Sequence, residues 1–181
     1  VMNVDNYIKY YEGVVHESLC DDLISHDFPY EASKYQTHDS SAIVKEERVQ
    51  MSDSWIKKDS LFYTAVKSCY ENVIVKYQSD FPLFTVGRTT DFRINKYDKG
   101  GFMSKHVDNI HHSHGQQYGY PQVSALLYLN DDYDGGEFYV ADKKFCPIKG
   151  SAIIFPSNFM FPHEAKIVTK GTRWSIITWL M

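Results

Sequence analysis

A metal site is the first chemistry that this sequence suggests. His106 and Asp108 are two residues apart. Side chains two apart on a strand point to the same face, so one imidazole nitrogen and one carboxylate oxygen are presented together. His163, in the stretch FPHEAK, is the candidate for a third ligand. Two histidines and one carboxylate on one face of an ion leave three coordination positions open, and this facial triad is diagnostic of non-haem Fe(II) oxygenases.

The spacing of His106 and Asp108 is a weak signal by itself, and plainer interpretations stand beside it. The two residues could form a hydrogen-bonded pair in a surface turn, and His163 could be a lone histidine at the start of a strand. Three further histidines follow in NIHHSHG. We expect these residues, His111, His112 and His114, to lie in a solvated or substrate-facing loop. A second metal site is the alternative.

The composition argues against two classes of partner, nucleic acids and membranes. The net charge is −4 and no run of Lys or Arg occurs, so the footprint of a nucleic-acid-binding protein is missing. No apolar run approaches a membrane span, and VMNVDNYIKYY lacks the basic and apolar regions of a signal peptide. Cys20, Cys69 and Cys146 are widely spaced, form no CxxC pair and do not suggest a disulfide framework. We therefore expect a cytoplasmic protein.

The periodicity of the chain predicts one domain over residues 1–181, with helices first and strands after. A strand is expected over 6–15, a short helix over 17–26, and a loop over 27–42. A second helix, capped by Asp59, should end near Ser79, before Phe81-Pro82. Short strands are expected over 87–97, 122–130, 137–142, 143–148, 150–156, 164–170 and 172–180. This order predicts an α+β domain with a β-sandwich or barrel core and the helices packed on one sheet.

The C-terminal half carries a series of stretches in a recognisable order. They are RINKY, HVDN, LLYLND, GGEFYV, CPIKGSAIIFP, HEAKIV and GTRWSIITW. In order and spacing they resemble the 2-oxoglutarate-dependent Fe(II) dioxygenases, specifically the prolyl 4-hydroxylase-like branch. GRTTDFRINKY and HVDN look like the hydroxylases that modify hypoxia-inducible factor, and KGTRW looks like the collagen-type and algal enzymes. The resemblance implies a double-stranded β-helix, or jelly-roll, core over about residues 88–181.

The resemblance also implies roles for single residues. It assigns the iron to His106, Asp108 and His163, and the distal carboxylate of 2-oxoglutarate to Arg173. A guanidinium suits that carboxylate because it donates two parallel charge-assisted hydrogen bonds. The resemblance also places three aromatic residues in contact with the cosubstrate: Tyr128, Tyr97 and Trp179. For each of them, packing in the core without a ligand role is the alternative.

The activity that the resemblance implies is hydroxylation of an unactivated C–H bond, with O2 consumed and succinate and CO2 released. A prolyl residue in a peptide or protein is the expected target, and ascorbate is a candidate reductant. The alternatives are a free amino acid or other small molecule as substrate, a cupin-type metalloenzyme, and a catalytically silent binding module. Two polar stretches are candidates for a loop that closes over the substrate, residues 49–58 around Trp55 and residues 98–104.

Overall fold

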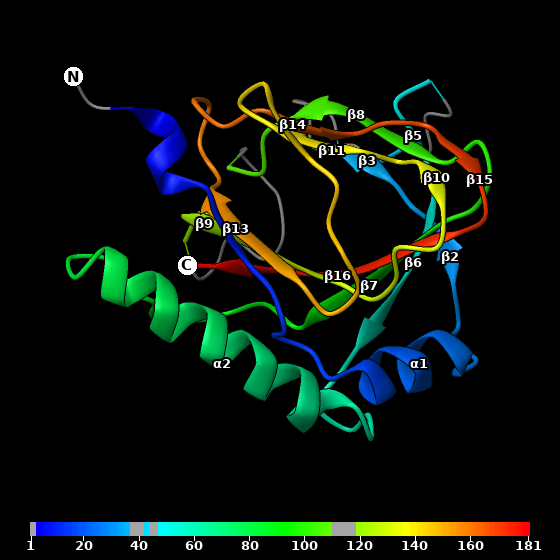
Figure 1. Cartoon of the computed structure of the whole chain (residues 1–181), viewed down its shortest axis with the longest axis horizontal. Helices are drawn as coiled ribbons and strands as arrows, with labels where there is room; N and C mark the ends of the chain where they lie inside the picture. Colours follow the sequence, from blue (N-terminus) through cyan, green and yellow to red (C-terminus); the bar gives the residue numbers. More distant parts are fainter. Residues whose placement is uncertain (1–2, 37–41, 44–46, 110–118) are drawn as a thin grey trace.

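Two antiparallel sheets face each other in the computed structural model, which describes residues 3–36, 42–43, 47–109 and 119–181 (Figure 1). The larger sheet has the order β1 (Lys9–Tyr11), β13 (Ala152–Pro156), β9 (Val123–Tyr128), β16 (Arg173–Leu180), β7 (Phe92–Tyr97), β6 (Ser52–Ile56) and β2 (Glu31–Ala32). The smaller sheet has the order β12 (Lys143–Phe145), β11 (Phe138–Val140), β14 (His163–Ala165), β8 (Phe102–His106) and β5 (Val49–Gln50). Two short pairs are formed by β10 (Asp134–Gly135) with β15 (Val168–Lys170) and by β3 (Tyr35–Gln36) with β4 (Ala42–Ile43).

The strand order within these sheets is that of a jelly roll. The central strands β13-β9-β16-β7 face β12-β11-β14-β8, and the chain passes repeatedly from one sheet to the other, as from β7 to β8 to β9 and from β13 to β14. The prediction of an α+β domain with a jelly-roll core is confirmed. Because the strands cross between sheets, residues distant in sequence meet between the two sheets.

The larger sheet is buried on both faces, and alternate residues of its strands belong to different cores. On β16, Ile176 and Leu180 pack in the core beneath the helices, whereas Ile177 and Trp179 pack in the core between the sheets. The period of two that defines a strand produces this division. A side chain that shares the parity of Ile177 therefore faces the inside of the jelly roll.

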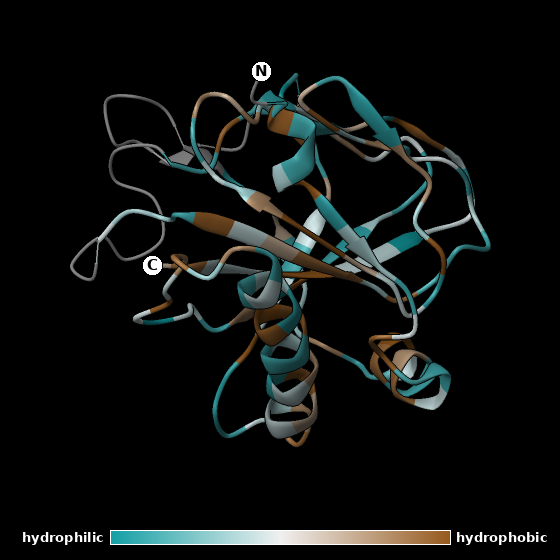
Figure 2. Cartoon of the chain, turned by 60° about the vertical axis from the view of Figure 1, so that its left-hand side comes forward, coloured by the Kyte–Doolittle hydropathy of each residue, from teal (hydrophilic) through white to brown (hydrophobic). Residues whose placement is uncertain are grey.

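The helices cover the outer face of the larger sheet. A 3-10 helix, Val4–Tyr7, precedes α1 (Glu17–Ser25), and α2 (Tyr63–Asp80) follows β6. In both views α1 and α2 lie on the same side of the two sheets (Figures 1 and 2). The Tyr70 hydroxyl of α2 donates a hydrogen bond to the Ile176 carbonyl oxygen at 2.8 Å, which ties the helix to the centre of the sheet. The prediction that the helices pack on one sheet is confirmed.

Several predicted boundaries are wrong, and each error has a local cause. Asp59 does not cap α2, because a turn after β6 delays the helix start to Tyr63, whose preceding residue makes no side-chain cap. The predicted first strand shortens to β1, and the predicted loop over 27–42 contains the short strands β2, β3 and β4. Strand 164–170 divides into β14 and β15, which pair in different sheets.

Residues 49–58 were one of two candidates for a loop over the substrate, and the structure does not form a loop there. They contain β5 and β6, which pair with β8 and β7. The polar residues of SDSWI alternate because they lie on one strand, and alternation of this kind indicates a strand rather than a loop. Within the described part of the chain, no helix combines the length and the apolar character needed to cross a bilayer.

Candidate metal centre and cosubstrate site

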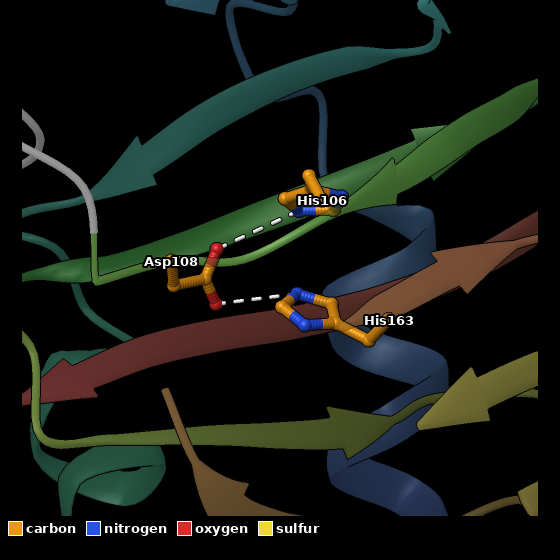
Figure 3. A group of neighbouring side chains, drawn as sticks. All are labelled: His106, Asp108 and His163. Atoms are coloured by element: carbon orange, nitrogen blue, oxygen red, sulfur yellow. Dashed lines mark ion pairs between the residues drawn. The ribbon is translucent and has the colours of Figure 1, made fainter. Parts of the chain in front are cut away.

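Three side chains form the only group of metal-ligand type found in the described ranges of the chain (Figure 3). His106 ends β8, His163 begins β14, and these two histidines are cross-strand partners. Asp108 follows β8 and lies between their rings. Its Oδ1 atom is 3.5 Å from His106 Nε2, and its Oδ2 atom is 3.3 Å from His163 Nε2. The three ligand atoms lie within 4.8 Å of one another, which suits a single ion.

The backbone fixes which nitrogen of each histidine faces this centre. The Nδ1 atom of His106 lies 2.8 Å from the Ser104 carbonyl oxygen, and the Nδ1 atom of His163 lies 3.2 Å from that of Phe161. A carbonyl oxygen can only accept, so each ring donates its Nδ1–H to the backbone and would bind a metal through Nε2. Both Nε2 atoms face Asp108. This arrangement is typical of metal-binding histidines, whose other nitrogen donates to a backbone carbonyl.

The electrostatics of the group also suit a cation. Burial lowers the pKa of His106, and the neighbouring His163 ring lowers it further, so the imidazole is neutral near pH 7. Burial alone would raise the pKa of Asp108, but the two imidazoles hold it well below its usual range. The neutral imidazole of His106 and the carboxylate of Asp108 are therefore available to a metal without competition from protons at neutral pH.

The carboxylate of Asp108 is held from behind by buried serines. The Ser124 hydroxyl on β9 donates a hydrogen bond to Asp108 Oδ2 at 2.6 Å. Ser124 Oγ also lies 2.7 Å from Ser157 Oγ, and the Ser157 carbonyl oxygen accepts from the Asn109 N–H at 3.0 Å. Both serines are fully buried. They limit the rotation of the carboxylate, as groups that support metal ligands do.

Replacing Ser124 with alanine should weaken metal binding by about tenfold, because loss of a partner to a ligand costs roughly 10- to 100-fold in affinity. Isothermal titration with Mn(II) or Fe(II) under argon would measure the change. Ser151→Ala is the matched control, since Ser151 is equally buried but donates to the Ile148 carbonyl oxygen. Equal metal affinity in the two variants would contradict the role given to Ser124.

Arg173 is the most unusual buried side chain in the described structure. It is only 1% exposed at the start of β16. The Nε, Nη1 and Nη2 atoms find no hydrogen-bond partner in the described chain. Its Cζ atom instead lies 4.7 Å from the Tyr97 ring centre, 5.2 Å from that of Tyr128 and 6.0 Å from that of Phe138. A buried guanidinium with unsatisfied donors is costly unless a ligand supplies the acceptors.

The tyrosines beside Arg173 complete a site for a carboxylate. Burial raises the pKa of Tyr97 and of Tyr128, although the guanidinium of Arg173 counteracts the shift. Both phenols are therefore protonated and can donate hydrogen bonds. The Tyr128 hydroxyl is buried and has no hydrogen-bond partner among the described residues. Arginine and tyrosine together offer a fork and an O–H group to one carboxylate.

Phe138 links this carboxylate site to the metal centre. Its ring is near Arg173 on one side, and its centre lies 5.9 Å from the His163 ring on the other. Gly136 gives Arg173 its space, because a Cβ atom there would lie 3.1 Å from Arg173 Cδ, and its φ is +62°. Gly135 and Gly136 both have positive φ, a conformation that glycine adopts without a steric penalty. Arg173 and the metal centre are therefore both neighbours of the Phe138 ring.

Trp179 lies on the same inner face of β16 and is 1% exposed. It is the cross-strand partner of Ser124, so it belongs to the metal end of the strand. Trp55, on β6, lies nearer the surface, with 38% exposure and its ring centre 6.4 Å from that of Trp179. The predicted histidine loop lies outside the described residues, which include none of His111, His112 and His114.

Two polar residues of the site, Arg93 and Asn95, were missed by the sequence analysis. Both lie on β7 and share the inner face with Tyr97, and Ser175 lies on β16 opposite Asn95. The Asn95 Oδ1 and Ser175 Oγ atoms are buried and lack hydrogen-bond partners within the described chain. The alternation in FRINKY, with Phe92 and Ile94 facing the helices, is the signal that indicates an inward polar face.

Comparison with known proteins agrees with this geometry. Residues 92–181 match the model of the 2OG-Fe(II) oxygenase superfamily. The chain is 29% identical over 139 residues to prolyl 3-hydroxylase 1 from Homo sapiens, covering 66% of this chain and 19% of that protein. It therefore spans about a fifth of the length of this curated relative.

Two solved structures share the fold. A prolyl hydroxylase from Trichoplax adhaerens, in complex with a hypoxia-inducible factor peptide fragment, superposes with a TM-score of 0.74 at 20% identity, over 97% of this chain and 84% of that chain. The viral collagen prolyl hydroxylase of Paramecium bursaria Chlorella virus-1, as its 2OG complex, gives a TM-score of 0.70 at 15% identity, over 96% and 95% of the two chains. At these identities the likeness is one of fold.

Proposed function

We propose that this chain, whose residues 92–181 belong to the 2OG-Fe(II) oxygenase superfamily, is a dioxygenase that hydroxylates a prolyl residue in a peptide or protein. The observation that carries the cosubstrate assignment is the buried, unpartnered guanidinium of Arg173 beside the His106, Asp108 and His163 group. A dicarboxylate that reaches from a metal to Arg173 satisfies both features at once.

The residues present fit the cofactors of the superfamily. Iron(II), 2-oxoglutarate and O2 would supply the oxidising power for C–H hydroxylation, with succinate and CO2 released. The imidazoles of His106 and His163 and the carboxylate of Asp108 would hold the iron. Arg173 and Tyr128 would hold the distal carboxylate of 2-oxoglutarate, because their donors have no other partner in the described residues.

The chain itself contributes orientation and a dry environment. Tyr128 and Arg173 are almost completely buried, so their hydrogen bonds to a carboxylate would not compete with water. The protonated phenol of Tyr128 adds a donor but no charge. A monocarboxylate with a shorter chain would leave the guanidinium without a partner, and this cost selects for 2-oxoglutarate.

The prolyl assignment is supported by the names of the similar proteins. The relative similar in sequence is a prolyl 3-hydroxylase. The two proteins similar in fold are a prolyl hydroxylase in complex with a hypoxia-inducible factor peptide fragment and a viral collagen prolyl hydroxylase. The sequence resemblance favours carbon 4 of the ring, whereas the curated relative carries the name of a 3-hydroxylase. A free amino acid is the second candidate, and it is favoured by the buried Arg93 Nε atom, which has no hydrogen-bond partner among the described residues and could bind a carboxylate.

Succinate formation with defined substrates tests the proposal. Purified protein, Fe(II), 2-oxoglutarate and ascorbate would be incubated with proline-containing peptides, with the same peptides carrying alanine for proline, and with free L-proline. We expect succinate above the peptide-free background only where proline is present, and a product 16 Da heavier whose fragmentation gives carbon 3 or carbon 4. Succinate release that does not depend on proline would contradict the prolyl assignment but not the assignment as a dioxygenase.

A further inference from the structure

Arg93 is a second cationic side chain on the inner face of the larger sheet. It lies on β7, opposite Ile177 of β16, whose side chain belongs to the core between the sheets. The Arg93 Cζ atom lies 4.9 Å from the centre of the Trp179 ring. Its Nε atom is buried without a hydrogen-bond partner, and within the described ranges no carboxylate forms an ion pair with it. Unlike Arg173, it is partly exposed.

The position of Arg93 places it on the substrate side of the site. Its other cross-strand partner is Trp55, which is 38% exposed and marks the outer end of this row of side chains. Trp179 beneath it is the partner of Ser124, which holds Asp108. The cosubstrate end, by contrast, is the row that contains Tyr97 and Arg173. Arg93 therefore lies between the outer rim and the metal end, away from the 2-oxoglutarate clamp.

The chemistry of Arg93 indicates what it binds. The guanidinium lies over the Trp179 ring, and its Nε–H group has no acceptor among the described residues. The edge of a guanidinium matches two oxygens of one carboxylate. The nearest acidic side chain along the neighbouring strand, Asp53, accepts instead from the Ser33 hydroxyl. The buried Asn95 Oδ1 atom, two residues further on, is also without a partner in the described chain; it would accept from an N–H group of a ligand, not from its carboxylate.

We propose that Arg93 binds a carboxylate of the substrate, next to the C–H bond that is hydroxylated. The inference rests on the proposed function, because it places the substrate at the open side of the metal centre. The carboxylate has two sources, the α-carboxylate of a free or terminal proline and the side chain of an acidic residue beside a prolyl residue. A neutral main-chain carbonyl would engage the guanidinium without neutralising its charge.

Binding measurements with two matched pairs of probes test this proposal. The first pair is N-acetyl-L-proline and N-acetyl-L-prolinamide. The second is a peptide blocked at both ends with aspartate after its proline, and the same peptide with asparagine there. Calorimetric titrations would use protein loaded with Fe(II) and 2-oxoglutarate under argon, so that Arg173 is already engaged. The variants are Arg93→Gln and Arg93→Lys. Lys96→Met is the control, because Lys96 on the same strand faces outward near Trp174.

The expected result is a preference of roughly tenfold or more for the carboxylate member of at least one pair. Arg93→Gln should remove that preference, Arg93→Lys should retain part of it, and Lys96→Met should leave it unchanged. The pair that shows the preference identifies the source of the carboxylate. No preference in the wild type, or a preference that survives in Arg93→Gln, would overturn the proposal. If the wild type did not bind 2-oxoglutarate at all, the proposed function itself would be refuted, so the two failures are distinguishable.

Discussion

Replacing Arg173 with methionine should abolish 2-oxoglutarate binding and, at the same time, stabilise the cofactor-free protein. The two effects share one cause. Without ligand, the guanidinium is 1% exposed and its donors have no acceptor in the described chain, so its burial costs free energy. With ligand, the same donors would make two charge-assisted hydrogen bonds to a carboxylate. Methionine fills a similar volume among the aromatic rings and needs no partner.

The magnitudes are large enough to separate the two effects. Loss of two charge-assisted hydrogen bonds, each about 1.5–3 kcal/mol, should weaken 2-oxoglutarate binding by roughly 10²–10⁴-fold. Relief of the unsatisfied guanidinium should raise the free energy of unfolding of the cofactor-free protein by about 1–3 kcal/mol. Calorimetric titration with 2-oxoglutarate in the presence of Mn(II), and urea denaturation without ligands, would measure both quantities.

Two companion variants make the Arg173 experiment decisive. Arg173→Lys keeps the charge but loses the fork, so it should bind 2-oxoglutarate weakly and gain no stability. Lys58→Met introduces methionine at an exposed cation and should change neither quantity. Destabilisation of the cofactor-free Arg173→Met protein would show that the guanidinium has structural partners, and tight 2-oxoglutarate binding by this variant would remove Arg173 from the site.

Replacing Asp108 with alanine should remove metal binding almost completely. Asp108 supplies the only carboxylate of the group and lies between the two Nε2 atoms. The remaining histidines would face each other, with ring centres 4.2 Å apart, and nothing would balance the charge of a divalent ion. We expect Fe(II) affinity to fall by at least about 10³-fold, since a hard carboxylate donor is lost from a three-ligand site.

A thermal shift measured with and without a chelator would report this loss directly. A metal that binds only the folded state stabilises it by RT ln(1 + [L]/Kd), which is about 4 kcal/mol at 1,000 times the Kd. The wild type should therefore melt at a lower temperature after chelation, whereas Asp108→Ala should melt at one temperature in both conditions. Asp142→Ala removes an exposed, ion-paired aspartate and should behave as the wild type. A chelator-sensitive melting temperature in Asp108→Ala would contradict the assignment of the centre.

The acid side of the pH profile follows from the same ligands. The pKa values of Asp108 and His106 are lowered, so protons compete with a metal for these two ligands only below the usual range of histidine. Metal affinity should accordingly be constant above about pH 6.5 and decline as the solution becomes more acidic.

Much of the centre was visible in the sequence because its parts obey local rules. His106 and Asp108 share one face because they are two apart, and Arg173 and Tyr128 lie in strands with clear patterns. The meeting of His163 with His106 is different. It depends on the pairing of β14 with β8, and the register between strands so distant in the chain is not encoded in either segment alone.

The inner polar face of β7 could not be predicted from the local sequence pattern alone. Both faces of this strand are buried, so Arg93 and Asn95 stand within a stretch that reads simply as a strand. Only the packing of Phe92 and Ile94 beneath the helices reveals which face is internal. The error at residues 49–58 has a related origin, because β5 and β6 are short, polar strands that depend on their neighbours for pairing.

The most direct test of the whole account is an optical titration under argon. Fe(II) would be added to the purified protein, followed by 2-oxoglutarate, while the visible spectrum is recorded for a weak charge-transfer band. The account predicts a band in the wild type, no band in His163→Ala, and a band in Arg173→Met only at much higher 2-oxoglutarate concentration. A wild-type protein that binds iron but gives no band would contradict the account, because its centre would then not chelate 2-oxoglutarate.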